Sequence, residues 1–148
     1  FVSGSPLGVG VTTVAATDLT GTASQNARAV MLGNPVLPKS ERTFSRFFNT
    51  GAFGLPAIGT FGNAARSVMR GPGINNFDSA VFKNFPLRES LRLQFRGEFY
   101  NIFNHTQFSA VDTTARFDAQ GRQVSGQFGQ MTAARDPRQI QLALRLYF

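Results

Sequence analysis

The residue types that most often carry out chemistry are scarce in this chain of 148 residues. Cysteine is absent, which excludes disulfides and thiolate metal sites, and His105 is the single histidine. Transition-metal sites combine several such ligands, so we expect neither a metal nor another cofactor. Asp112 and Asp118 could form a pair of carboxylates for acid–base chemistry, but nothing in the sequence fixes their geometry. We expect all three side chains to lie in solvated loops.

Two glycine-containing segments could be taken for phosphate-binding loops, namely 59–62 (GTFG) and 70–73 (RGPG). A phosphate-binding loop carries a Lys-Ser or Lys-Thr pair and joins a strand to a helix, and neither segment has this context. A Gly-x-Ser-x-Gly nucleophile motif is also absent. We therefore expect turns at both places and predict that the chain is not an enzyme, with no catalytic, cofactor-binding or metal-binding residue.

Charge is the next possible source of function, because the formal net charge is +7. A basic chain often binds nucleic acid. Here 13 of the 15 basic residues are Arg, but they are scattered along the chain without a basic run. We expect no nucleic-acid partner and keep a soluble basic β-domain that binds polyanions as an alternative.

Two segments near the C-terminus alternate apolar and polar residues. In 91–103, one face carries Leu91, Leu93, Phe95, Gly97 and Phe99, and the other carries Arg92, Gln94, Arg96 and Glu98. In 139–148, one face carries Ile140, Leu142, Leu144, Leu146 and Phe148, and the other carries Gln139, Gln141, Ala143, Arg145 and Tyr147. A period of two predicts strands, whereas a helix would mix arginine with leucine around its surface.

Three features favour strands that cross a membrane. Both segments match a tilted membrane strand of about 9–11 residues. The connections alternate between short (86–90) and long (17–76, 104–138), as do the periplasmic turns and outer loops of barrels. Aromatic residues gather at both ends of the strands, as in the girdles that flank a bilayer core. Phe82, Phe85, Tyr147 and Phe148 would lie at the periplasmic, lower ends of the strands. Phe77, Phe99, Tyr100 and Phe103 would lie at the outer, upper ends. No run of about 18 apolar residues occurs, so no transmembrane helix is expected.

The fold class expected is all-β, namely the C-terminal antiparallel strands of a transmembrane β-barrel with long irregular outer loops. Residues 77–148 would supply the last three strands (77–85, 91–103 and 139–148), a periplasmic turn (86–90) and an outer loop (104–138). Residues 1–76 would supply a weak strand at 8–16 and a long extracellular loop, with a helical turn around 63–69. The chain has no visible signal peptide, and we expect a fragment without its plug and N-terminal domains.

The two faces of these strands would meet different surroundings. The apolar face would contact lipid, because a charge facing lipid at mid-depth costs about 2–4 kcal/mol. The polar face would line the lumen and carries Arg92, Gln94, Arg96, Glu98, Gln141 and Arg145. Arg96 and Glu98 would form a structural ladder of charges or line a path for a solute. Antiparallel pairing would bring Glu98 near Gln139 or Gln141, and Arg92 near Arg145 or Tyr147. Lys83 would lie near the periplasmic rim.

Several motifs resemble the closing region of TonB-dependent, Oar-like outer-membrane transporters. They are 59–66 (GTFGNAAR), 70–73 (RGPG), 77–85 (FDSAVFKNF), 93–105 (LQFRGEFYNIFNH) and 134–141 (ARDPRQIQ). The resemblance covers residues 42–148. The last strand also resembles the assembly signal of bacterial outer-membrane barrels, at Ile140, Leu142, Leu144, Leu146, Tyr147 and Phe148.

The resemblance implies a 22-stranded barrel with a plug, located in the bacterial outer membrane and driven by the TonB–ExbB–ExbD system. Such proteins often carry an N-terminal carboxypeptidase-regulatory-like domain and take up a large nutrient. The implied partners are outer-membrane lipid, the barrel-assembly machinery, the TonB system through the missing plug, and an unidentified nutrient. A plug-less porin or a surface adhesin remains an alternative.

Overall fold

The computed structural model describes residues 1–22 and 25–148. Apart from two 3-10 helices, η1 (Lys39–Glu41) and η2 (Thr50–Ala52), the regular structure is β-strand. The chain divides into two compact units. We call Phe1–Val2, Ile74–Gln107 and Arg135–Phe148 the sheet unit, and Ser3–Gly73 and Phe108–Ala134 the loop unit. Among the described residues, no helix is long and apolar enough to cross a membrane.

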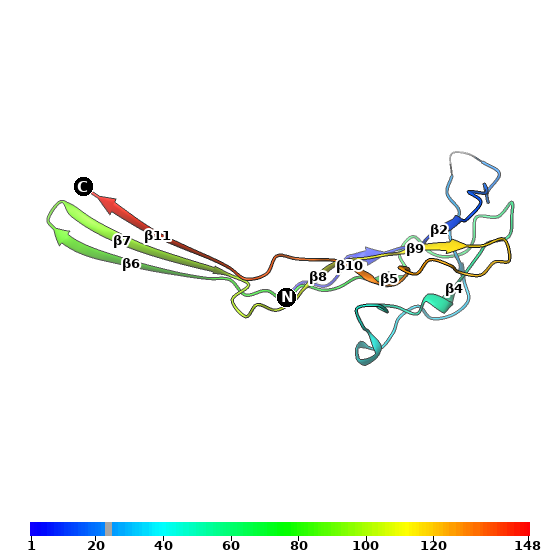
Figure 1. Cartoon of the computed structure of the whole chain (residues 1–148), viewed down its shortest axis with the longest axis horizontal. Helices are drawn as coiled ribbons and strands as arrows, with labels where there is room; N and C mark the ends of the chain where they lie inside the picture. The colour runs from blue at the N-terminus through cyan, green and yellow to red at the C-terminus, as the bar shows by residue number, and fades with distance from the viewer. Residues whose placement is uncertain (23–24) are drawn as a thin grey trace. The chain divides into compact units, whose positions relative to one another are not determined.

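The sheet unit contains three long strands, β6 (Ser79–Arg88), β7 (Leu91–Tyr100) and β11 (Gln139–Tyr147). They form one antiparallel sheet with β7 in the centre (Figure 1). Strand β11 pairs with β7 along its whole length, with Gln141 opposite Glu98 and Tyr147 opposite Arg92. The expected antiparallel pairing is therefore confirmed for these two strands. The outer edges of β6 and β11 have no partner within the described residues, so the sheet is open.

The hairpin between β6 and β7 is tighter than the sequence suggests. We expect a break at 86–90, but β6 continues to Arg88 and the turn consists of Glu89 and Ser90. Pro86 lies opposite Arg92, and the register shifts between Pro86 and Arg88. Proline is tolerated because β6 is an edge strand, where a missing N–H removes no bond to a neighbour, and a local irregularity absorbs the rest.

The opposite end of the sheet also differs from the prediction. Strand β7 ends at Tyr100 rather than at residue 103, because Asn101 takes a positive φ of 50°. A left-handed residue turns the chain out of the extended conformation, and asparagine tolerates this better than most residues. Strand β6 likewise begins at Ser79 rather than at Phe77.

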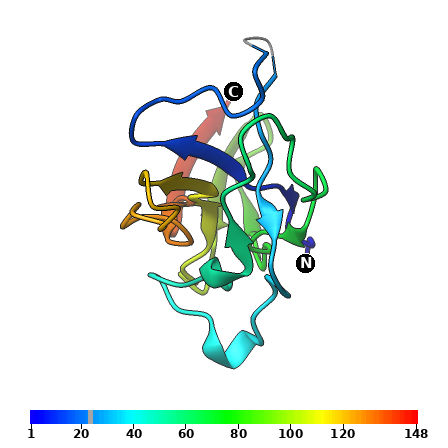
Figure 2. The ribbon, with the colours of Figure 1, turned by 90° about the vertical axis from the view of Figure 1, so that its right-hand side faces the viewer.

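The loop unit consists of short strand pairs joined by long irregular segments (Figure 2). The antiparallel pairs are β1 (Pro6–Leu7) with β5 (Met69–Arg70), β3 (Val30–Met31) with β4 (Phe53–Gly54), and β8 (Phe108–Val111) with β10 (Met131–Ala134). Strand β2 (Gly10–Thr13) lies parallel to β9 (Thr114–Phe117). The strand expected at 8–16 is thus present, but it pairs within the loop unit and adds no fourth strand to the sheet of β7. The helical turn expected at 63–69 is absent, because these residues form irregular backbone that leads into β5.

A hydrophobic core holds the loop unit together. The rings of Phe48, Phe53 and Phe128 meet edge to face, with centroids 5.2–6.0 Å apart. Phe117 and Ala115 from β9 pack into the same core. This core joins residues 3–73 to 108–134, so the two expected outer loops fold as one body. The sequence does not reveal it, because the contributing residues follow no period.

Candidate functional site

The sheet of β6, β7 and β11 has two chemically different faces. Residues directly opposite each other on neighbouring strands share a face, so the register assigns every side chain. The apolar face carries Val81 and Phe85 from β6, Leu93, Phe95 and Phe99 from β7, and Ile140, Leu142, Leu144 and Leu146 from β11. The polar face carries Phe82 and Asn84 from β6, Arg92, Gln94, Arg96 and Glu98 from β7, and Gln141, Arg145 and Tyr147 from β11. All six residues expected to face the lumen therefore lie on one face of the sheet.

Side chains on the polar face contact one another across the strands. Near the hairpin, the Arg92 guanidinium lies 4.8 Å from the ring centroid of Tyr147. The Tyr147 hydroxyl donates a hydrogen bond of 3.2 Å to Gln94 Oε1. Gln94 in turn donates from Nε2 to Asn84 Oδ1 at 3.0 Å. These contacts make a continuous polar surface that can interact with water or solutes and contains no nucleophile with a base beside it.

An ion pair and an aromatic ring extend this polar surface. Arg96 pairs with Glu98 on the same strand. The Arg96 guanidinium also lies 5.1 Å from the ring centroid of Phe82 on β6, which is a cation–π geometry. The expectation that Phe82 belongs to a lower aromatic girdle is wrong, because this ring lies on the polar face in the middle of β6. The sequence misleads here because β6 places apolar residues on both faces.

The apolar face is exposed rather than packed. Leu142 and Leu144 are 63% and 68% exposed, and Ile140 and Leu146 are more than half exposed. Together with Tyr147 on the polar face and Phe148 after the strand, these are the residues of the expected assembly signal. In water, so large a contiguous apolar surface is rare on a monomer and marks a contact with another apolar phase or molecule.

One charge interrupts the apolar face. Lys83 is expected near the periplasmic rim, next to the hairpin. It lies instead opposite Phe95, midway along the ten-residue strand β6. Its Nζ lies 6.0 Å from the ring centroid of Phe85, two residues closer to the hairpin. The ammonium group thus leans toward the hairpin end of the strand, as long basic side chains do when they reach from an apolar region to a wet one.

Hydrogen bonds of Asn101 connect the three segments that leave the sheet at the end opposite the β6–β7 hairpin. Its backbone N–H donates to Asp78 Oδ1 at 2.9 Å. Its side-chain amide donates to the carbonyl oxygens of His105 at 3.2 Å and Asp136 at 3.4 Å, and its Oδ1 accepts from the His105 N–H at 3.0 Å. The side chain is buried, and its polar atoms all have partners. We call Asp78, Asn101, Asn104 and Gln107 the rim clasp.

The other members of the rim clasp repeat this arrangement. Asn104 Oδ1 accepts from the Arg138 N–H at 3.0 Å. The buried Gln107 accepts from the Asn75 N–H at 2.8 Å through Oε1, and its carbonyl oxygen accepts from the Arg135 N–H at 2.7 Å. Side-chain amides therefore satisfy backbone groups where the strands end. Sequence reasoning missed this role, although 93–105 and 134–141 are among the segments that carry the resemblance.

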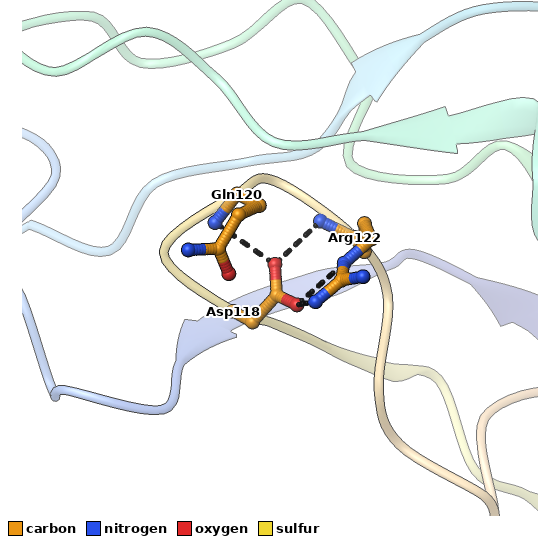
Figure 3. Close-up of polar contacts among 3 residues, drawn as sticks. All are labelled: Asp118, Gln120 and Arg122. Atoms are coloured by element: carbon orange, nitrogen blue, oxygen red, sulfur yellow. Dashed lines mark hydrogen bonds and ion pairs between the residues drawn. The ribbon is translucent and has the colours of Figure 1, made fainter.

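The carboxylates of the loop unit serve their own turns. Asp118 accepts hydrogen bonds from the N–H groups of Gln120 and Arg122 and from the Arg122 guanidinium (Figure 3). The bond from the Arg122 N–H is the main cause that holds the pKa of Asp118 below its ordinary value of 3.8. The Thr20 N–H likewise lowers the pKa of Asp18. Asp112 Oδ1 accepts from the Thr114 N–H at 2.9 Å, so each of the two carboxylates bonds to backbone N–H groups within its own turn.

The described residues contain no group of three or more His, Cys, Asp or Glu side chains that could hold an ion. His105, the single histidine, contributes its backbone to the rim clasp and has an exposed side chain. The chemistry of the sheet unit is therefore that of a surface with one polar and one apolar side.

Comparison with known proteins gives one family. The model of a family described as "Outer membrane beta barrel domain" matches residues 1–141, nearly the whole chain. No curated protein matches the chain, and no solved structure matches it.

Proposed function

Because the chain belongs to the outer membrane beta barrel domain family, we propose that it forms closing strands of a TonB-dependent transporter for a large nutrient. The chain is an all-β part of a barrel in the bacterial outer membrane. The alternative interpretation, a soluble basic β-domain that binds polyanions, is therefore wrong. The proposal concerns what the barrel carries, how it is driven and which side of the sheet faces which surroundings.

The two-faced sheet is the observation that carries the proposal. Its apolar face contacts lipid, because aliphatic side chains fill it and a lipid-facing charge at mid-depth costs about 2–4 kcal/mol. Its polar face lines the lumen, where Arg92, Gln94, Arg96 and Glu98 meet water, solute or a plug. Lys83 is the exception on the lipid side, and its lean toward the hairpin brings its charge closer to the membrane surface.

The connections support a direction for the strands. The hairpin of Glu89 and Ser90 is as short as the periplasmic turns of barrels. Every long connection joins the other end of the sheet, where Ser79 is opposite Phe99 and Gln139 is opposite Tyr100. We therefore place the hairpin in the periplasm and the loop unit outside the cell.

The energy source and further partners follow from the resemblance stated above. The TonB–ExbB–ExbD system would act on a plug encoded elsewhere in the parent protein, in a barrel of 22 strands. The barrel-assembly machinery would recognise β11 through its alternating apolar residues and Phe148. No catalytic step is assigned to the chain.

Conductance and labelling test the proposal together. The full-length protein in a planar bilayer should show no stable open channel, because a plug fills a TonB-dependent barrel. A permanently open channel would identify a plug-less porin instead.

Cysteine labelling tests which face of the sheet meets water. Since the chain has no cysteine, Leu142→Cys and Gln141→Cys offer a matched pair for labelling in outer membranes. A water-soluble maleimide should modify Gln141→Cys and spare Leu142→Cys, and the reverse result would invert the faces.

A further inference from the structure

The loop unit contains a pocket whose charged lining is entirely basic. The pocket has a volume of about 700 Å³ and is lined by Arg28 and Arg66, with Asn26, Phe61 and Gly8 among their neighbours. None of its lining residues is Asp or Glu. Within the described residues, neither Arg28 nor Arg66 forms an ion pair. Arg28 and Arg66 both have exposed side chains, so the pocket carries two positive charges with no carboxylate among its lining residues, and an anion would be attracted to it.

Glycines bring the two arginines to this pocket. A Cβ on Gly8 would lie 2.3 Å from the Arg66 carbonyl oxygen, so only glycine permits this approach. Gly10 forms a β-bridge with Arg28. Gly62 has a φ of +70°, and a Cβ there would lie 2.0 Å from the Arg28 carbonyl oxygen. The backbone of Arg66 thus packs closely against Gly8 and that of Arg28 against Gly62, which fixes the position of both residues at the pocket.

We propose that this pocket binds a small free solute that carries two oxyanion groups, such as a dicarboxylate or a phosphorylated acid. Each guanidinium offers a planar pair of donors that fits a carboxylate or phosphate group. The Asn26 amide can donate a further hydrogen bond, and the Phe61 ring, 42% exposed, offers an apolar surface for the carbon part of the solute. The volume falls within the range of small-molecule sites, roughly 300–1,000 Å³. The inference is independent of TonB-driven uptake, because it concerns binding alone.

Calorimetric titration of the full-length protein in detergent tests this site, with succinate and inorganic phosphate as probes. The double variant Arg28→Gln/Arg66→Gln should weaken succinate binding about tenfold or more, as expected for the loss of charge-assisted hydrogen bonds. The double variant Arg46→Gln/Arg116→Gln removes the same charge from exposed positions of the loop unit that do not line the pocket. It should bind succinate within about twofold of the wild type, because distant surface charges are screened.

Arg66→Lys provides a variant that retains the charge but loses the planar donor pair. Its succinate affinity should fall between those of the wild type and the double Gln variant. Equal loss in both double variants would overturn the proposal, since net charge would then explain the binding. Absence of succinate binding by the wild type would also overturn it. So would binding of purified lipopolysaccharide through Arg28 and Arg66 without binding of succinate, because the ligand would then be a lipid headgroup.

Discussion

The two units of this chain differ in the apolar side chains that they bury. Every buried apolar side chain among the described residues belongs to the loop unit, where Phe48 is 1% and Phe117 is 2% exposed. In the sheet unit, the buried side chains are the amides of Asn101 and Gln107, while leucines such as Leu144 are exposed. The loop unit buries apolar side chains in a core, as a domain in water does. The sheet unit exposes its apolar side chains and buries polar ones.

The difference shows how the pattern of apolar residues in a sequence depends on the solvent that surrounds each part of the fold. Exposing apolar area to water costs about 25 cal/mol per Å², so a sheet with a bare leucine face is unfavourable in water and favourable in lipid. Backbone groups at the strand ends also need hydrogen-bond partners, and the rim clasp provides them. Each unit holds eight of the 16 phenylalanines, so their number alone does not distinguish the two units.

The largest expected effect is in the core of the loop unit. Phe48→Ala should destabilise this unit by about 3–5 kcal/mol, because it removes a fully buried ring and leaves a cavity. Limited proteolysis of intact cells should then cut the loop unit, while the barrel stays folded and inserted. Ile58→Ala is the control, since Ile58 is 77% exposed. Loss of barrel insertion in the Phe48 variant would mean that the units are not independent.

A charge on the apolar face of the sheet tests the other half of the comparison. Leu144→Arg should lower the free energy of unfolding in bilayers by about 2–4 kcal/mol, because the new guanidinium would face lipid near mid-depth. Gln141→Arg, on the polar face of the same strand and opposite Glu98, should be tolerated. Urea unfolding in vesicles, followed by heat-modifiable electrophoretic mobility, measures both variants. Equal destabilisation by the two arginines would contradict the assignment of the faces.

The rim clasp should contribute less than either of these. Asn101→Ala should cost about 1–3 kcal/mol, because buried backbone groups lose their partners. Asn101→Gly should cost less than the alanine variant, because glycine accepts the positive φ of 50° without strain. His105→Ala should lie within about 0.5 kcal/mol of the wild type, since that side chain is exposed. An alanine variant as stable as the wild type would show that the clasp holds nothing together.

The sequence predicts the long strands well because their information is local. Strands β7 and β11 alternate along their whole length, so period, face and pairing follow from the residues themselves. Strand β6 is harder, because Phe82 and Lys83 each lie on the face that their polarity disfavours. Its extension through Pro86 depends on β6 being an edge strand, which is a property of the sheet and not of the segment.

The loop unit and the clasp depend on contacts between distant segments, which no local pattern contains. Phe48 and Phe128 meet although neither stands in a periodic segment. Asn101 and Asp136 are joined only once the strands are paired. The pocket of Arg28 and Arg66 is likewise created by packing against glycines far along the chain. Scattered arginines and glycines therefore say little about binding until the fold is known.

Acid should loosen one turn of the loop unit. The pKa of Asp118 is lowered mainly by the hydrogen bond from the Arg122 N–H. Since the folded value lies below the unfolded one, this turn is stabilised above pH 3.8 and loses that support as pH falls through the lowered pKa. Amide exchange of Gln120 and Arg122, corrected for intrinsic rates, should therefore accelerate as the pH falls from about 5 to 2. Asp118→Asn should show the same exchange at all pH values, because its amide does not titrate. Equal acid sensitivity in the variant would show that another group, and not the Asp118 carboxylate, causes the faster exchange.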